Sequence, residues 1–190
     1  MNRFRIYIQK ESYKFSATHF TIFSATQAER LHGHNYAVGV ECELADLNNL
    51  GMGFEFNTLK PHIKKLADHW DEHILIAGRN PFISSRSEML GETEHQVFEF
   101  NGRSYRFPKD EVRILPVSNI TSEELAREFA KCLVVRWFDS LSDADRSLLQ
   151  TNLKWIEVSI EETRGQKATY RMNAPFASTD AIKKEMKERL

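Results

Sequence analysis

The 190-residue sequence contains only two cysteines, Cys42 and Cys132, and almost no excess of either charge. Two cysteines are too few for a disulfide framework and are not spaced as metal-binding pairs, which favours a reducing cytoplasm. The 26 basic and 27 acidic residues are spread along the chain, so no basic stripe follows the pattern of a nucleic-acid binder. We therefore expect a cytoplasmic protein that does not bind nucleic acid.

Long apolar runs are also missing from the sequence. No stretch reaches the roughly 20 residues of a membrane-spanning helix, and the N-terminal MNRFRIYIQK lacks the apolar centre of a signal peptide. The length fits one domain, 1–190. Hydrophobic residues make up 41% of the sequence, which is enough to form a core without disulfides. We expect a single folded domain with no membrane partner.

Two segments near the N-terminus alternate apolar and polar residues with the period of two that is typical of β-strands. In the first, Phe15 and Ala17 lead to His19 on the same face. In the second, HGHNYAVGVECEL, His32 and His34 precede an apolar row on one face. The sequence therefore predicts three histidines at strand ends, on faces that point into the core.

Imidazole nitrogens are good zinc ligands, and three protein ligands with one open position are typical of catalytic zinc. Structural zinc usually takes four ligands that include cysteine. The HGH motif alone is permissive, and a turn that happens to contain histidines is the alternative interpretation.

A third alternating segment, WIEVSIEET, places Glu162 on the side of its apolar row and Glu161 on the other side. A carboxylate that points inward is either paired or holds a ligand. Glu162 is therefore a candidate binding residue.

Apolar residues at steps of three and four predict an amphipathic helix in NTLKPHIKKLADHW, capped by Asn57 or Thr58, and another in TSEELAREFAKCLVVRWF. Between them, Asn101-Gly102 separates two alternating runs, which predicts an inserted β-hairpin at about residues 95–107. The order of these elements predicts an α+β fold with antiparallel strand pairs.

The motifs FSATHF, LHGHNY, GMGFEFNTLK, DEHILI, NITSEELA and EVSIEET follow one another along nearly the whole chain. Together they resemble the 6-pyruvoyltetrahydropterin synthase family, which includes 6-carboxytetrahydropterin synthases. The resemblance implies the tunnelling fold: a four-stranded antiparallel sheet with a helical layer, closed into a barrel when the chain assembles as a homotrimer or homohexamer. The inserted hairpin is the one sizeable segment that the resemblance does not cover.

The resemblance also implies a zinc cofactor and a dihydropterin substrate. The family's zinc ligands fall on His19, His32 and His34, in agreement with the face assignment. Its pterin-binding residues fall on Glu162, Thr121 and Ser122. For Thr121 a plain helix cap is an equal alternative.

The family's catalytic residues are carried over with two departures. Its Asp-His pair matches Glu72 and His73, with Asp71 as the other possible partner of His73, and the polar end of a helix is the plain alternative. Its cysteine position is Ala28, so no thiol acts there. The neighbouring Glu29 gives ExxHGH, which resembles a subgroup in which glutamate replaces cysteine and the dihydroneopterin side chain is cleaved. A solvated loop charge is the alternative for Glu29.

Three functions follow from this resemblance. The favoured one is a zinc-dependent lyase that converts dihydroneopterin to 6-hydroxymethyl-7,8-dihydropterin for folate synthesis, with Glu29 as the base and His73 moving the second proton. The second is a 6-pyruvoyl- or 6-carboxytetrahydropterin synthase acting on dihydroneopterin triphosphate, with Lys14 or Arg164 at the mouth of the site. The third is a non-catalytic zinc-binding oligomeric scaffold.

Overall fold

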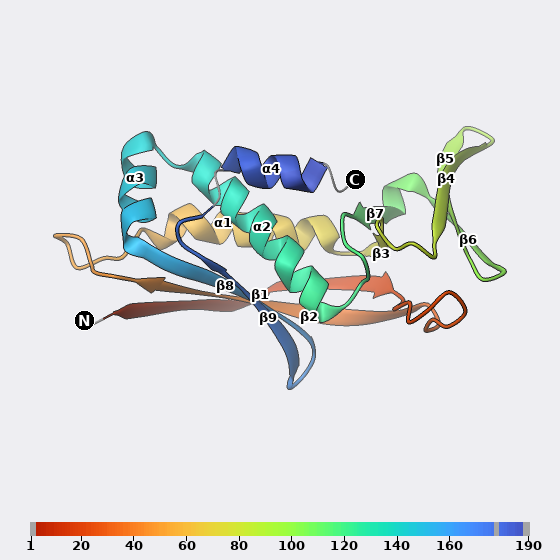
Figure 1. Cartoon of the computed structure of the whole chain (residues 1–190), viewed down its shortest axis with the longest axis horizontal. Coiled ribbons are helices and arrows are strands. Elements are labelled where there is room, and N and C mark those ends of the chain that lie inside the picture. The colour runs from red at the N-terminus through yellow and green to blue at the C-terminus, as the bar shows by residue number, and fades with distance from the viewer. Residues whose placement is uncertain (1–2, 177–178, 188–190) are drawn as a thin grey trace.

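The large sheet dominates the computed structural model, which describes residues 3–176 and 179–187 (Figure 1). Its strand order is β7-β3-β1-β2-β8-β9. The four long strands, which pair antiparallel, are β1 (Phe4–His19), β2 (His32–Leu44), β8 (Leu153–Thr163) and β9 (Gln166–Asn173). The predicted α+β class and four-stranded antiparallel sheet are confirmed.

Two short parallel strands extend this sheet beyond the prediction. They are β3 (His73–Ala77) and β7 (Val112–Leu115). β3 pairs with β1 only at Ala17 and Thr18. Short apolar runs such as HILIA carry no alternation, so the sequence alone cannot separate them from other buried segments.

An irregularity in β1 allows both halves of this strand to contribute buried side chains to the core. Ile8 is buried in its first half and Tyr13 in its second, although an even and an odd position of a regular strand point to opposite faces. The register with β2 shifts between Gln9 and Lys14, and such a bulge moves the following side chains to the other face. His19 therefore lies on the buried side.

Helices lie along one side of the large sheet (Figure 1). The helices are α1 (Phe56–Trp70), α2 (Ser122–Ser140), α3 (Asp143–Asn152), α4 (Thr179–Lys187) and the short η1 (Lys109–Glu111). The ring of Trp70 meets Phe129 edge to face, with centroids 5.4 Å apart. No helix within the described residues is long and apolar enough to cross a membrane.

The two predicted helix starts have different outcomes. Thr121 caps α2 as predicted, because its side chain accepts a hydrogen bond from Glu124 N. The predicted caps Asn57 and Thr58 of α1 are wrong, since the helix begins at Phe56 with Glu55 at the cap and no side-chain cap bond. Apolar Phe56 gave no start signal, and the two polar residues lie in the first turn.

A second, three-stranded sheet lies at one end of the molecule (Figure 1). It consists of β4 (Ser84–Leu90), β5 (Thr93–Phe100) and β6 (Arg103–Pro108). The β5–β6 turn has φ 43° at Asn101 and φ 76° at Gly102, which is the left-handed conformation that Asn-Gly favours. The predicted hairpin is thus two strands of a larger element, which we call the small sheet.

Candidate active site

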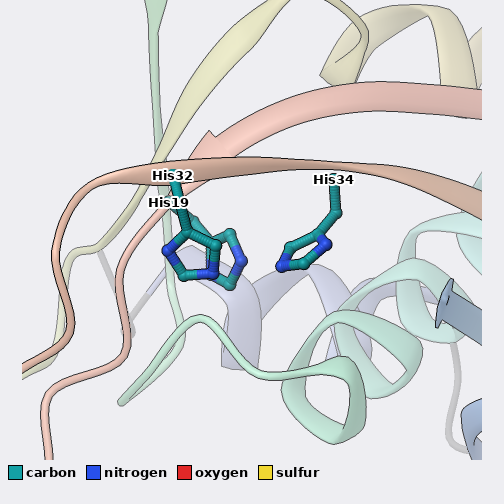
Figure 2. Close-up of side chains that lie close together, drawn as sticks. All are labelled: His19, His32 and His34. Atoms are coloured by element: carbon teal, nitrogen blue, oxygen red, sulfur yellow. The ribbon is translucent and has the colours of Figure 1, made fainter.

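Three histidines meet where β1 ends and β2 begins. His19 pairs with His32, and Ala17 pairs with His34, across the antiparallel strands. Residues opposite each other or two apart share a face, so the three rings gather on one side of the strands (Figure 2). One nitrogen of each ring lies within 4.8 Å of the others. The structure brings together the three histidines that the sequence singled out.

Backbone carbonyls set the orientation of two of these rings. His19 Nδ1 lies 3.2 Å from Ile120 O, and His32 Nδ1 lies 2.8 Å from Arg30 O. A carbonyl only accepts, so Nδ1 carries the hydrogen and Nε2 keeps its lone pair, as in histidines that bind metals. His19 Nε2 is buried and has no hydrogen bond within the described residues. The residues therefore fit a cation with nitrogen ligands.

The protonation of His19 also suits a metal ligand. Burial, and next the nearby His32, lower the pKa of His19, while Glu162 acts in the opposite direction. A lowered pKa keeps the imidazole neutral near pH 7, which is the form that binds metals.

Glu162 lies beside the histidines, on the side that its position in the strand predicts. Its Oε1 is 3.1 Å from His34 Nε2 and 3.4 Å from His19 Nε2. Ser122 Oγ donates to its other oxygen at 3.2 Å, and Tyr36 Oη donates to Oε1 at 3.4 Å. The neighbouring Glu161 points away and accepts a hydrogen bond from Gly165 N at 2.7 Å.

A cavity of about 310 Å³ adjoins this cluster. The predicted site residues that line it are His19, Glu29, Thr121, Ser122 and Glu162. Its volume is within the range of small-molecule sites. Thr121 both lines the cavity and caps α2, so the two interpretations of this residue are compatible.

Glu29 is a partly buried carboxylate of this cavity. Thr21 N donates to Glu29 Oε2, and Glu29 N donates to Thr21 O, both at 2.9 Å. Burial acts to raise the pKa of Glu29, but the hydrogen bonds from Thr21 and the fields of His32 and His19 outweigh it, so the pKa is lowered. The carboxylate is therefore held in place and ionised, unlike a free loop charge.

Glu72 and His73 line a different cavity, of about 500 Å³, together with His34. Glu72 has a φ of 57°, and its N–H donates to Ser16 O at 2.8 Å. The Asp71 carboxylate accepts from Ser16 N at 2.6 Å, and His73 Nδ1 contacts the Asp71 carbonyl. Within the described residues no carboxylate hydrogen-bonds His73. Within a single chain, His73 therefore lies outside the cavity that contains Glu29.

Sequence reasoning missed two contributors to the site. Tyr36 follows His34 by two positions on the same face, so parity alone could have identified it. Burial and the adjacent Glu162 raise the pKa of its hydroxyl, which stays protonated and donates to that carboxylate. Thr21 lies in a connection without periodicity, so no sequence signal pointed to it.

Comparisons with known proteins identify the family and agree with the fold. The model of the family described as 6-pyruvoyl tetrahydropterin synthase matches residues 7–173. The "Putative 6-carboxy-5,6,7,8-tetrahydropterin synthase" of Methanocaldococcus jannaschii is 28% identical over 158 residues, which cover 83% of this chain and 89% of the relative. The protein of the same name from Pyrococcus horikoshii is 32% identical over 128 residues, 67% of this chain and 71% of the relative.

Solved structures show the same fold. The crystal structure of Plasmodium vivax 6-pyruvoyl tetrahydropterin synthase has a TM-score of 0.75 and 22% identity, covering 91% of this chain and 99% of that one. A variant of that protein, in which a glutamate described as a catalytic residue is replaced by alanine, matches equally well. The match over residues 7–173 and the shared fold show that this chain belongs to the 6-pyruvoyl tetrahydropterin synthase family.

Proposed function

We propose that this chain is a zinc-dependent lyase that cleaves dihydroneopterin to 6-hydroxymethyl-7,8-dihydropterin and glycolaldehyde. The observation that carries the proposal is Glu29, whose ionised carboxylate shares a cavity with His19 and Glu162. Ala28 stands where the family's cysteine is expected, so a carboxylate is the base that this cavity offers.

Substrate binding is assigned to Glu162. A carboxylate accepts two parallel N–H bonds from the 2-amino-pyrimidinone edge of a pterin. The side chain already takes hydrogen bonds from Ser122 and Tyr36, which fix its oxygens at the cavity wall. In the proposed complex the pterin ring lies next to α2, and the pterin side chain extends toward the histidines.

The histidines are the proposed zinc ligands. The buried Nε2 of His19, which makes no hydrogen bond within the described residues, supports this assignment, together with the neutral form that its lowered pKa favours. Bound zinc supplies a Lewis acid that orients and acidifies the substrate's vicinal hydroxyls.

Cleavage is a retro-aldol reaction in which Glu29 acts as the base. Glu29 takes the proton of the second side-chain hydroxyl, and the bond between the first and second side-chain carbons breaks. The electron pair moves into the C6=N5 imine of the ring, and glycolaldehyde leaves. A proton returned to the first carbon completes 6-hydroxymethyl-7,8-dihydropterin, with no net oxidation. A carboxylate that is partly withdrawn from water and held by Thr21 suits this step.

His73 is the proposed carrier of the second proton, and Glu72 or Asp71 its support. Because His73 and Glu72 line the other cavity of their own chain, this role requires a second copy, as in a homotrimer or homohexamer. The glutamate that is a catalytic residue in the Plasmodium vivax protein is a precedent for carboxylate catalysis on this fold.

A synthase acting on dihydroneopterin triphosphate is the second candidate. The relatives named as 6-carboxytetrahydropterin synthases favour it. Lys167 also lines the cavity, where its positive charge could bind a phosphate group of the substrate. Lys14, which was expected at the mouth, lines a different cavity and pairs with Glu11 at 3.2 Å.

Product analysis tests the proposal. Zinc-loaded protein is incubated separately with dihydroneopterin and with its triphosphate, and the products are identified by mass spectrometry. We expect glycolaldehyde and 6-hydroxymethyl-7,8-dihydropterin from the first substrate, and a loss of about 10²- to 10⁴-fold in kcat for Glu29→Ala with zinc content unchanged. Release of triphosphate without glycolaldehyde would instead establish the second candidate. Full zinc loading with no turnover of either substrate would favour the third function, a non-catalytic zinc-binding scaffold.

A further inference from the structure

The connection between β1 and β2, residues 20–31, carries Glu29 and is bounded by two of the clustered histidines, His19 and His32. Its own backbone bonds give it a defined shape, since Glu29 N donates to Thr21 O at 2.9 Å and Phe23 N to Gln27 O at 2.8 Å. These bonds lie within the connection, so they do not fix its position relative to the large sheet. That place depends on what packs against the connection.

The small sheet supplies an apolar support for this connection. Phe98 and Phe100 of β5 form one buried cluster with Phe20 and Ile22 at the start of the connection, and Ile76 of β3 and Val112 of β7 belong to the same cluster. The ring of Phe20 also stacks on Tyr105 of β6, with centroids 5.4 Å apart. The cluster is separate from the main core between the helices and the large sheet. The small sheet therefore packs on β3 and β7 of the large sheet and also on the start of the segment that carries Glu29.

The β5–β6 turn adds polar contacts to the same segment. Asn101 Nδ2 donates to Thr26 O at 3.0 Å, and Arg103 Nη1 donates to Glu29 O at 2.9 Å. Figure 1 shows this turn beside the connection between β1 and β2. The bond from Arg103 reaches the main chain of the residue whose carboxylate lines the cavity.

We propose that the small sheet is a positioning element for Glu29 and that Arg103 is its positioning residue. Arg103 is not one of the residues that line the cavity, and its hydrogen bond reaches the main chain of Glu29, so it acts through that residue. A base must lie within hydrogen-bond reach of the proton that it removes, and a small displacement lowers the rate of the chemical step. The catalytic consequence rests on the proposed function, whereas the placement of the connection can be measured without turnover.

The test compares Arg103→Ala with Arg103→Lys and with the matched control Arg106→Ala. Arg106 lies on the same strand and is also exposed, but it pairs with Glu88 inside the small sheet, at 2.6 Å. Hydrogen exchange measured by mass spectrometry reports on residues 20–31, and steady-state kinetics report kcat and KM. Zinc content is measured for every variant.

For Arg103→Ala we expect exchange of residues 20–31 to be about 2- to 10-fold faster, the effect of one solvent-accessible hydrogen bond. We expect kcat to fall about tenfold, with KM within about twofold and zinc content unchanged. Arg103→Lys should recover most of kcat, because it restores a donor. In a Glu29→Gln background Arg103→Ala should lower the residual rate no further, since the two residues act as one unit.

Unchanged exchange in Arg103→Ala, or the same changes in Arg106→Ala, would overturn the positioning role. A further loss of rate in the Glu29→Gln background would do the same. If the wild-type protein does not turn over dihydroneopterin, the proposed lyase function fails, and the exchange comparison alone decides the positioning role. Faster exchange in Arg103→Ala but not in Arg106→Ala then supports it.

Discussion

Replacing Glu162 by glutamine removes a negative charge from the cavity wall while keeping the size of the side chain. The carboxylate is proposed to accept two N–H donors of the pterin edge, and a hydrogen bond to a charged group contributes about 1.5–3 kcal/mol. Glutamine keeps one acceptor and turns an NH₂ group toward the second donor. Its amide oxygen still accepts from Ser122 or Tyr36, so part of the free-state network is retained.

We therefore expect Glu162→Gln to weaken pterin binding by about 2–3 kcal/mol, or about 30- to 150-fold in Kd. Calorimetric titration with fully oxidised neopterin measures this, because that ligand has the same pyrimidinone edge. Glu161→Gln is the matched control, since this neighbour points to the opposite face and accepts from Gly165 N. Binding by Glu162→Gln within about threefold of wild type, or an equal loss in Glu161→Gln, would refute the assigned role of Glu162.

Three further predictions concern the metal, pH and the core. His32→Ala should lose zinc and, with it, turnover, as measured by elemental analysis and product assay; retention of full zinc would contradict the ligand set. Burial and then neighbouring positive side chains lower the pKa values of His62 and His69, so the unfolded chain binds more protons and stability falls as pH drops through about 6.5. Urea titrations of the double His62→Gln, His69→Gln variant should show a flatter pH dependence, and an unchanged slope would contradict this. Phe129→Ala should cost about 3–5 kcal/mol in urea unfolding, because the ring is fully buried against Trp70; a loss below about 1 kcal/mol would contradict the packing.

Strand parity explains most of what the sequence predicted about the site. The period of two is local, so it placed His19, His32 and His34 on inward faces and distinguished Glu162 from Glu161 without knowledge of the fold. The strand bulge after Gln9 did not spoil this, because the apolar row near the histidines has its own phase.

Parts of the molecule that depend on distant contacts could not be predicted from the sequence. β3, β4 and β7 were missed because their short runs gain stability only from pairing with other strands. The sequence also gave no indication that His73 lines a different cavity from Glu29, because that separation is set by which edge of β1 carries β3. The link from Arg103 to Glu29 joins segments far apart along the chain, and only the folded structure brings them together.

The metal content and coordination of the purified protein decide whether the three histidines form the site described above. Elemental analysis with X-ray absorption at the zinc edge should find about one zinc ion per chain, bound by three imidazole nitrogens at about 2.0–2.1 Å and one exchangeable ligand. A protein that binds no zinc, or zinc with a ligand set that is unchanged when His19 and His34 are replaced, would contradict the proposed active site.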